Sequence, residues 1–169
     1  MSQELENKIE FKDKLLNFYN LHKLKVLTSI IILILIIIMG IFFKINNDKK
    51  NIIVAEKFVQ AGIHLSSGES DKAKILYEEI ILSKNKFYSL LSLVSILEKN
   101  LVKDEKIILD YFALLEKLNY SEERLDLISL KKALYLIKAK KNLEGNKLLK
   151  NLIEKKSKFK LLAEEIISN

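Results

Sequence analysis

The chain has 169 residues, carries 29 Lys and Arg against 22 Asp and Glu, and contains no Cys, no Pro and four Gly. Without Cys it can form neither a disulfide nor a thiolate metal site. The scarcity of Pro and Gly beside abundant Leu, Ile, Lys and Glu favours helices joined by short turns and predicts an all-α fold.

The first predicted element is a membrane-spanning helix at residues 26–43, which follows a short charged leader at residues 1–25. The run VLTSIIILILIIIMGIFF contains no charged side chain, and 14 of its 18 residues are Val, Leu, Ile or Phe. As a helix it would extend about 27 Å, close to the ~30 Å hydrocarbon core of a bilayer. Each of these apolar side chains favours insertion by about 0.3–0.6 kcal/mol at the membrane centre. We therefore expect a single N-terminal transmembrane helix.

Two alternatives compete with an uncleaved anchor. A cleaved secretory signal has an apolar region of about 7–15 residues after a short basic start, and it ends at small residues. Here the run is longer, the leader contains four acidic residues, and Ile41-Phe42-Phe43-Lys44 offers no such cleavage site. A buried core helix would normally have a polar face, which this run lacks. The sequence favours the anchor over both.

The charges that flank the span do not decide its orientation. They are His22, Lys23 and Lys25 before it and Lys44, Lys49 and Lys50 after it. The positive-inside bias is therefore nearly balanced, but a long domain can be translocated largely regardless of its charge. We expect a cytoplasmic leader and a soluble domain on the outer side of the membrane.

Residues 44–169 show helical periodicity throughout and predict three helix pairs followed by a terminal helix at residues 158–168. Breaks rich in Gly, Asn and Ser separate the helices, as at residues 66–68 and 83–85. Corresponding apolar positions recur at shifts of 35 and 72 residues, which is typical of a tetratricopeptide-like helical-repeat domain, an α-solenoid. The positions expected to pack within the repeats are Phe58, Gly62, Ala73, Tyr77, Leu93, Phe112, Leu130, Ala133 and Leu149.

The first pair resembles the tetratricopeptide repeat motif most closely. In FVQAGIHLSSGESDKAKILYEEI, Phe58, Ala61, Gly62 and Leu65 fall at the places of the first-helix W, L, G and Y, and Ala73 falls at the small position. Taken whole, the chain resembles the tetratricopeptide-repeat-like inner-membrane family that includes the ancillary subunit of the bacterial Sec translocon. That resemblance implies a periplasmic domain that contacts translocon subunits or periplasmic chaperones.

If the repeats stack normally, the first helices of the pairs line a concave surface that could hold a partner helix or an extended peptide. The alternative is that these side chains simply pack against adjacent helices. The candidate groove residues are Val59, Ile63, Leu91, Val94, Ile128, Lys131 and Tyr135.

No catalytic, metal-binding or phosphate-binding pattern is recognisable in the sequence. The two histidines, His22 and His64, are far apart, and adjacent pairs such as Glu78-Glu79 diverge by about 100° around a helix, whereas catalytic carboxylates must converge. Lys residues are scattered beside acidic ones and do not form a basic block with aromatics. We expect no enzyme activity, cofactor, nucleic acid or small-molecule substrate, and contact with membrane lipid near the span.

Two functions follow from this sequence. The first is a membrane-anchored protein-interaction scaffold of the bacterial inner membrane, an adaptor linked to the translocon or to periplasmic chaperones. The second is a membrane-tethered receptor that faces the cytosol and captures targeting peptides in its groove. The orientation of the span separates the two.

Overall fold

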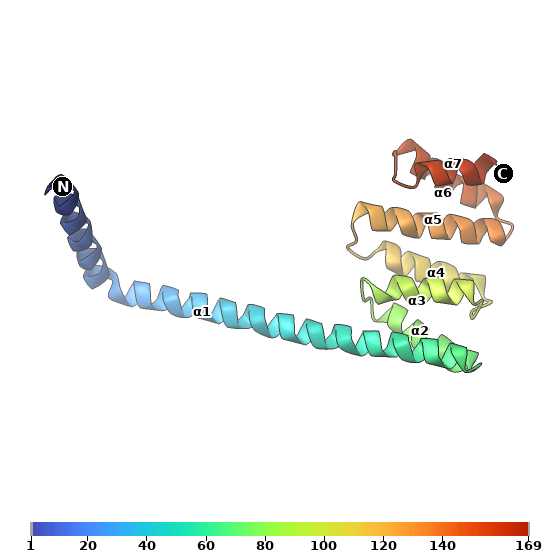
Figure 1. Cartoon of the computed structure of the whole chain (residues 1–169), viewed down its shortest axis with the longest axis horizontal. Helices are drawn as coiled ribbons and strands as arrows, with labels where there is room; N and C mark the ends of the chain where they lie inside the picture. Colours follow the sequence, from blue (N-terminus) through green and yellow to red (C-terminus); the bar gives the residue numbers. More distant parts are fainter. Residues whose placement is uncertain (1, 169) are drawn as a thin grey trace. The chain divides into compact units, whose positions relative to one another are not determined.

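The computed structural model describes the backbone of residues 2–168 and the side chains of residues 12, 21–25 and 27–168 (Figure 1). These residues form helices and turns without a strand, which confirms the all-α prediction. The chain divides into two compact units, Met1–Lys49 and Lys50–Asn169. The helices are α1 (Ser2–Ser66), α2 (Ser70–Leu82), α3 (Tyr88–Glu98), α4 (Glu105–Glu116), α5 (Glu122–Lys138), α6 (Asn142–Glu154) and α7 (Lys160–Ser168).

Unit 1 consists of the first part of α1, and a break at His22 divides this part into two helical stretches. His22 has φ −123° and ψ 18°, outside the helical region. The second stretch contains the apolar run, whose described side chains, at residues 27–43, are exposed within the structure. Thr28 Oγ1 donates to the carbonyl of Leu24 and Ser29 Oγ to that of Lys25, both at 2.8 Å, so both hydroxyls have partners in the helix. Within the described residues, one helix is long and apolar enough to cross a membrane.

Unit 2 is built from the last part of α1 and from α2 to α7. Consecutive helices run in opposite directions, so their turns alternate between the two ends of the unit (Figure 1). The expected first helix of this domain is not a separate element but the C-terminal part of α1. The reason is local, because residues 44–50, KINNDKK, contain neither Pro nor Gly to end a helix.

Several helices of unit 2 end in a residue with positive φ, although only one of these is Gly. After α1 it is Gly68 (φ 79°), after α3 it is Asn100 (φ 51°), and after α5 it is Lys140 (φ 63°). Each allows a backbone hydrogen bond that closes the helix, such as Leu101 N to the Ile96 carbonyl at 3.0 Å. At the opposite terminus of a helix, the Asp104 carboxylate caps α4 by accepting from Lys106 N at 2.8 Å.

Two clusters of buried side chains form the core of unit 2, one between α1 and α5 and the other between α5 and α7. Seven of the predicted packing positions are buried, and Phe58 is half-buried against the Tyr77 ring at 5.5 Å. Gly62 differs from the expectation, because it is exposed and a Cβ added there would meet no atom within 4 Å. The seven buried positions are Ala73, Tyr77, Leu93, Phe112, Leu130, Ala133 and Leu149.

Polar contacts link residues that are about one predicted repeat apart. Their sequence separations are 34, 38, 36 and 35 residues, close to the shift of 35 residues at which apolar positions recur in the sequence. These contacts join Asn51 to Asn85, Arg124 to the Lys86 carbonyl, Lys141 to Glu105, and Lys158 to Glu123.

Candidate functional site: two pockets that share a wall

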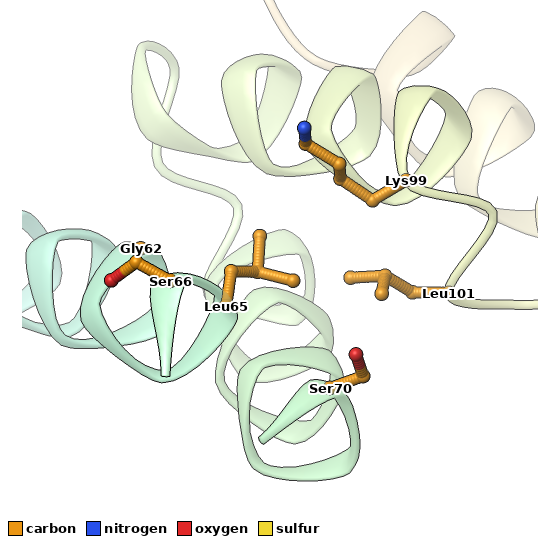
Figure 2. Close-up of a pocket in the computed structure, with 6 residues that line it drawn as sticks. All are labelled: Gly62, Leu65, Ser66, Ser70, Lys99 and Leu101. Atoms are coloured by element: carbon orange, nitrogen blue, oxygen red, sulfur yellow. The ribbon is translucent and has the colours of Figure 1, made fainter. Parts of the chain in front are cut away.

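The first pocket has a volume of about 460 Å³ and lies near the C-terminal ends of α1 and α3. Figure 2 shows the side chains of Leu65 and Leu101 pointing toward one another across it. Because Gly62 has no side chain, the α1 side of this pocket stays open. Its lining residues are Gly62, Leu65, Ser66, Ser70, Lys99 and Leu101.

The second pocket has a volume of about 360 Å³ and lies between the C-terminal ends of α3 and α5. Two of the predicted groove residues, Lys131 and Tyr135, line it beside Leu134, which is 38% exposed. The complete lining is Leu97, Glu98, Asn100, Val102, Lys131, Leu134, Tyr135, Lys138 and Ala139.

The two pockets are neighbours, because residues 99–102 form a wall between them. Lys99 and Leu101 line the first pocket, whereas Asn100 and Val102 line the second. The pockets also occupy related places in successive helix pairs, since Gly62 and Leu65 of the first correspond to Leu97 and Asn100 of the second at a shift of 35 residues.

The predicted groove residues are not all on one accessible surface. Val59 and Ile63 are 60% and 57% exposed on α1, and Leu91 is 37% exposed on α3. Val94 is half-buried and packs against the core, as Tyr135 does. Of the predicted set, Lys131 and Tyr135 on α5 line the second pocket.

Ile128 lies in the core with no exposed surface, so it cannot belong to a binding groove. Ile128 and Tyr135 are seven residues apart and therefore share a helix face. That face packs toward the core, where the Tyr135 ring lies 6.2 Å from the Phe112 ring. The exposed apolar side chain of α5 is instead Leu134.

Charge around the second pocket is predominantly positive. Lys131, which is half-buried, and Lys138 have no ion-pair partner within the described residues, and neither does Glu98. Close by, Lys141 forms an ion pair with Glu105, which raises the pKa of Lys141. Burial, together with the Glu105 carboxylate, raises the pKa of the Tyr135 phenol. Tyr135 is therefore a neutral hydrogen-bonding group at the edge of the pocket.

The candidate acid and base residues have structural partners. His64 contacts the Glu69 carboxylate, which also accepts from Lys72 Nζ at 2.7 Å, and these two contacts lower the pKa of Glu69. Of the adjacent carboxylates Glu78 and Glu79, the second pairs with Lys57 at 2.7 Å. Within the described residues, no group of three His, Cys, Asp or Glu side chains could hold a metal ion.

Sequence reasoning missed most of the pocket lining. The sequence indicates residues 100–104 only as a break between helices, and its periodicity carries no signal for the part of residues 99–102 in two pockets. The repeat shift of 35 residues relates Gly62 to Leu97, and the break expected from residue 100 agrees with the end of α3 at Glu98, but neither shows which side chains line a pocket. No protein-family model, curated protein or solved structure matches this chain.

Proposed function

We propose that this protein is a single-span membrane-anchored scaffold whose tetratricopeptide-like helical-repeat domain binds a polypeptide partner. The paired pockets are the observation that carries this proposal. Two neighbouring pockets at related positions of successive helix pairs suit an extended chain that presents side chains at a regular spacing.

The contacts between residues about one repeat apart support the α-solenoid interpretation. In a solenoid each pair packs on its neighbours, so equivalent positions meet across the interface. The contact from Lys141 to Glu105 and that from Lys158 to Glu123 fit this arrangement in the second helices and the first helices respectively. The terminal helix expected at residues 158–168 corresponds to α7, whose Ala163 is buried in the second core cluster.

An uncleaved anchor is supported by the exposure of the apolar run, because a core helix would be buried. A secretory signal sequence would share this exposure, but the acidic leader and the lack of a small-residue cleavage site in the segment Ile41-Phe42-Phe43-Lys44 favour the anchor. We place the protein in the bacterial inner membrane with unit 2 in the periplasm. The partners proposed are translocon subunits or periplasmic chaperones.

Site-specific crosslinking tests the binding role. A photoreactive side chain at Leu134, in the second pocket, should capture a protein in intact membranes, and mass spectrometry should identify it as a translocon subunit or a periplasmic chaperone. The matched control is Ile75, which is 54% exposed on α2 and lines neither pocket. Equal capture at both positions, or capture at Ile75 alone, contradicts the proposal.

Topology and processing are tested separately. A reporter that is active only in the periplasm, fused after Asn169, should be active, whereas activity of a cytosolic reporter alone would favour a receptor that faces the cytosol. The protein should remain in the membrane after alkaline carbonate washing and should retain its leader. A mature N-terminus beyond Phe43 would identify the apolar run as a cleaved signal.

A further inference from the structure

At one end of unit 2, which we call the tether end, three turn segments lie near the first residues of the unit. The tether end comprises residues 50–51, 83–87, 117–124 and 155–160. Hydrogen bonds connect these segments in series, from Asn51 to Asn85 at 2.7 Å, from Arg124 to the Lys86 carbonyl at 2.9 Å, and from Lys158 to Glu123 at 2.8 Å. In Figure 1 the turns after α2, α4 and α6 lie at this same end.

The tether end is strongly basic, whereas the opposite end of unit 2 is not. Its four segments contain nine Lys or Arg and two acidic residues. The turns at the opposite end, residues 67–71, 99–105 and 139–144, contain four Lys and five acidic residues. Lys155, Lys158 and Lys160 form ion pairs, but Lys84 and Lys86 are exposed and have no ion-pair partner within the described residues. The excess positive charge is therefore available to an anionic surface.

Exposed apolar side chains accompany these lysines. Phe87 is 55% exposed in the turn between α2 and α3, and Leu82 is 60% exposed immediately before that turn. Ile52 and Ile53, at the start of unit 2, are 57% and 53% exposed. Lysines beside an aromatic and aliphatic side chains are the combination that binds the interface of an anionic bilayer.

The short segment between the apolar run and unit 2 limits how far the tether end can lie from a membrane that the run crosses. Lys50 follows Phe43, the last residue of the apolar run, by seven residues. Seven residues reach at most roughly 24 Å even when fully extended. If residues 26–43 cross a membrane, Lys50 and the segments bonded to Asn51 must therefore lie close to the headgroups of that membrane.

We propose that the tether end docks on the headgroup region of an anionic bilayer, with Phe87 at the interface and Lys84 and Lys86 among the phosphates. This inference rests on the proposed membrane span. Docking would hold the α2–α3 turn against the membrane and keep the turn between α1 and α2 away from it. The partner surface is lipid of the membrane that the chain itself spans.

Single-cysteine labelling of the full chain tests the docking, because the chain contains no native Cys. Ser83→Cys at the tether end and Ser67→Cys in the turn between α1 and α2 are matched variants, since both serines are exposed. Each carries an environment-sensitive fluorophore and is reconstituted in phosphatidylglycerol vesicles that contain headgroup spin-labelled lipid. We expect at least twofold stronger quenching at position 83 than at position 67.

Charge variants test the cause of the docking. Lys84→Glu combined with Lys86→Glu should reduce quenching at position 83 to the level found at position 67, and so should replacing phosphatidylglycerol with phosphatidylcholine. The matched control is Lys103→Glu combined with Lys106→Glu, which changes the same amount of charge near the opposite end and should leave quenching at position 83 unchanged.

A label at Ile36→Cys, in the apolar run, separates the two proposals. Quenching there by acyl-chain spin label, with equal quenching at positions 83 and 67, would overturn the docking and leave the span intact. No quenching at position 36 would overturn the span and the docking with it. Quenching at position 83 that depends on protein density, and not on spin-labelled lipid, would assign the surface to a second copy and also overturn the docking.

Discussion

The carboxylate of Asp126, on α5, accepts a hydrogen bond from Nζ of Lys155, which follows α6. The Asp126 side chain is 5% exposed and the Lys155 side chain 34% exposed, so the pair joins the two helices of the third pair at the edge of the core. A buried carboxylate that loses its charged partner keeps its desolvation cost without compensation.

Lys155→Met should therefore lower the free energy of unfolding by about 1–3 kcal/mol, because the Asp126 carboxylate stays buried without its cation. Urea unfolding of the full chain in detergent, followed by circular dichroism, measures this change. The control is Lys158→Met, which removes the ion pair with Glu123. In that pair the Lys158 side chain is 72% exposed and the Glu123 side chain is 56% exposed. That change should cost at most about 1 kcal/mol, and an equal loss in both variants contradicts the prediction.

Gly145→Ala should destabilise unit 2 by about 1–3 kcal/mol, because a Cβ there overpacks the contact between α5 and α6. The added atom would lie 2.6 Å from Ile137 Cγ1 and 2.9 Å from the Ala133 carbonyl oxygen. Gly62→Ala is the matched helical change in open space, and it should stabilise by about 0.5–1 kcal/mol through its helix propensity. Thermal unfolding of the two variants should therefore shift in opposite directions.

Lys140→Gly should stabilise the protein by about 0.5–1 kcal/mol, because Lys140 has φ 63° and Gly adopts this conformation without strain. The hydrogen bonds that close α5, from Lys140 N and Lys141 N, would remain. Lys138→Gly serves as the control, since position 138 is the last helical residue of α5 and loses helix propensity instead. Denaturant midpoints of the two variants should move apart, and a lower midpoint for Lys140→Gly would contradict the assignment of strain.

Tyr111→Phe should make the free energy of unfolding fall less steeply with increasing pH in alkaline solution. Burial and a hydrogen bond with the Glu78 carboxylate raise the pKa of Tyr111 in the folded state above its ordinary value of 10.0. Because the pKa of Tyr111 is raised in the folded state, the protonated phenol stabilises the fold fully below about pH 10. Its contribution to the free energy of unfolding falls as the pH rises from there, since the unfolded chain releases the phenolic proton more readily. The difference in unfolding free energy between the variant and the parent, measured from neutral to alkaline pH, should shrink above about pH 10.

Helical periodicity predicts the apolar run, most helix boundaries and the buried repeat positions, because all three depend on local spacing. It predicts the end of α1 at residues 66–68, but it does not predict that the apolar helix and the first helix of the repeat domain are one continuous element. The segment KINNDKK is polar enough to suggest a linker, but nothing in it breaks a helix. The sequence therefore predicts which segments are helical better than it predicts whether two successive helical segments are separated by a break.

The candidate site depends on features that repeat spacing cannot give. Ile128 has the residue type of a groove position, yet the packing of α5 directs its face into the core. The wall at residues 99–102 depends on α3 ending at Glu98, one turn earlier than a shift from α1 would place it. The end of α3 itself has a local cause, since Asn100 has φ 51°, but the burial of Val102, which is 6% exposed, depends on tertiary packing that spacing does not give.

The principal backbone contacts of unit 2 join helices that are one or two places apart in the chain. The first helices of such a chain can therefore pack before the C-terminal helices have been made, because each contact closes only a short loop. As the chain emerges from the ribosome, each new helix can pack on the helix that is already synthesised. Assembly from the first helices of unit 2 toward α7 would then keep pace with translation.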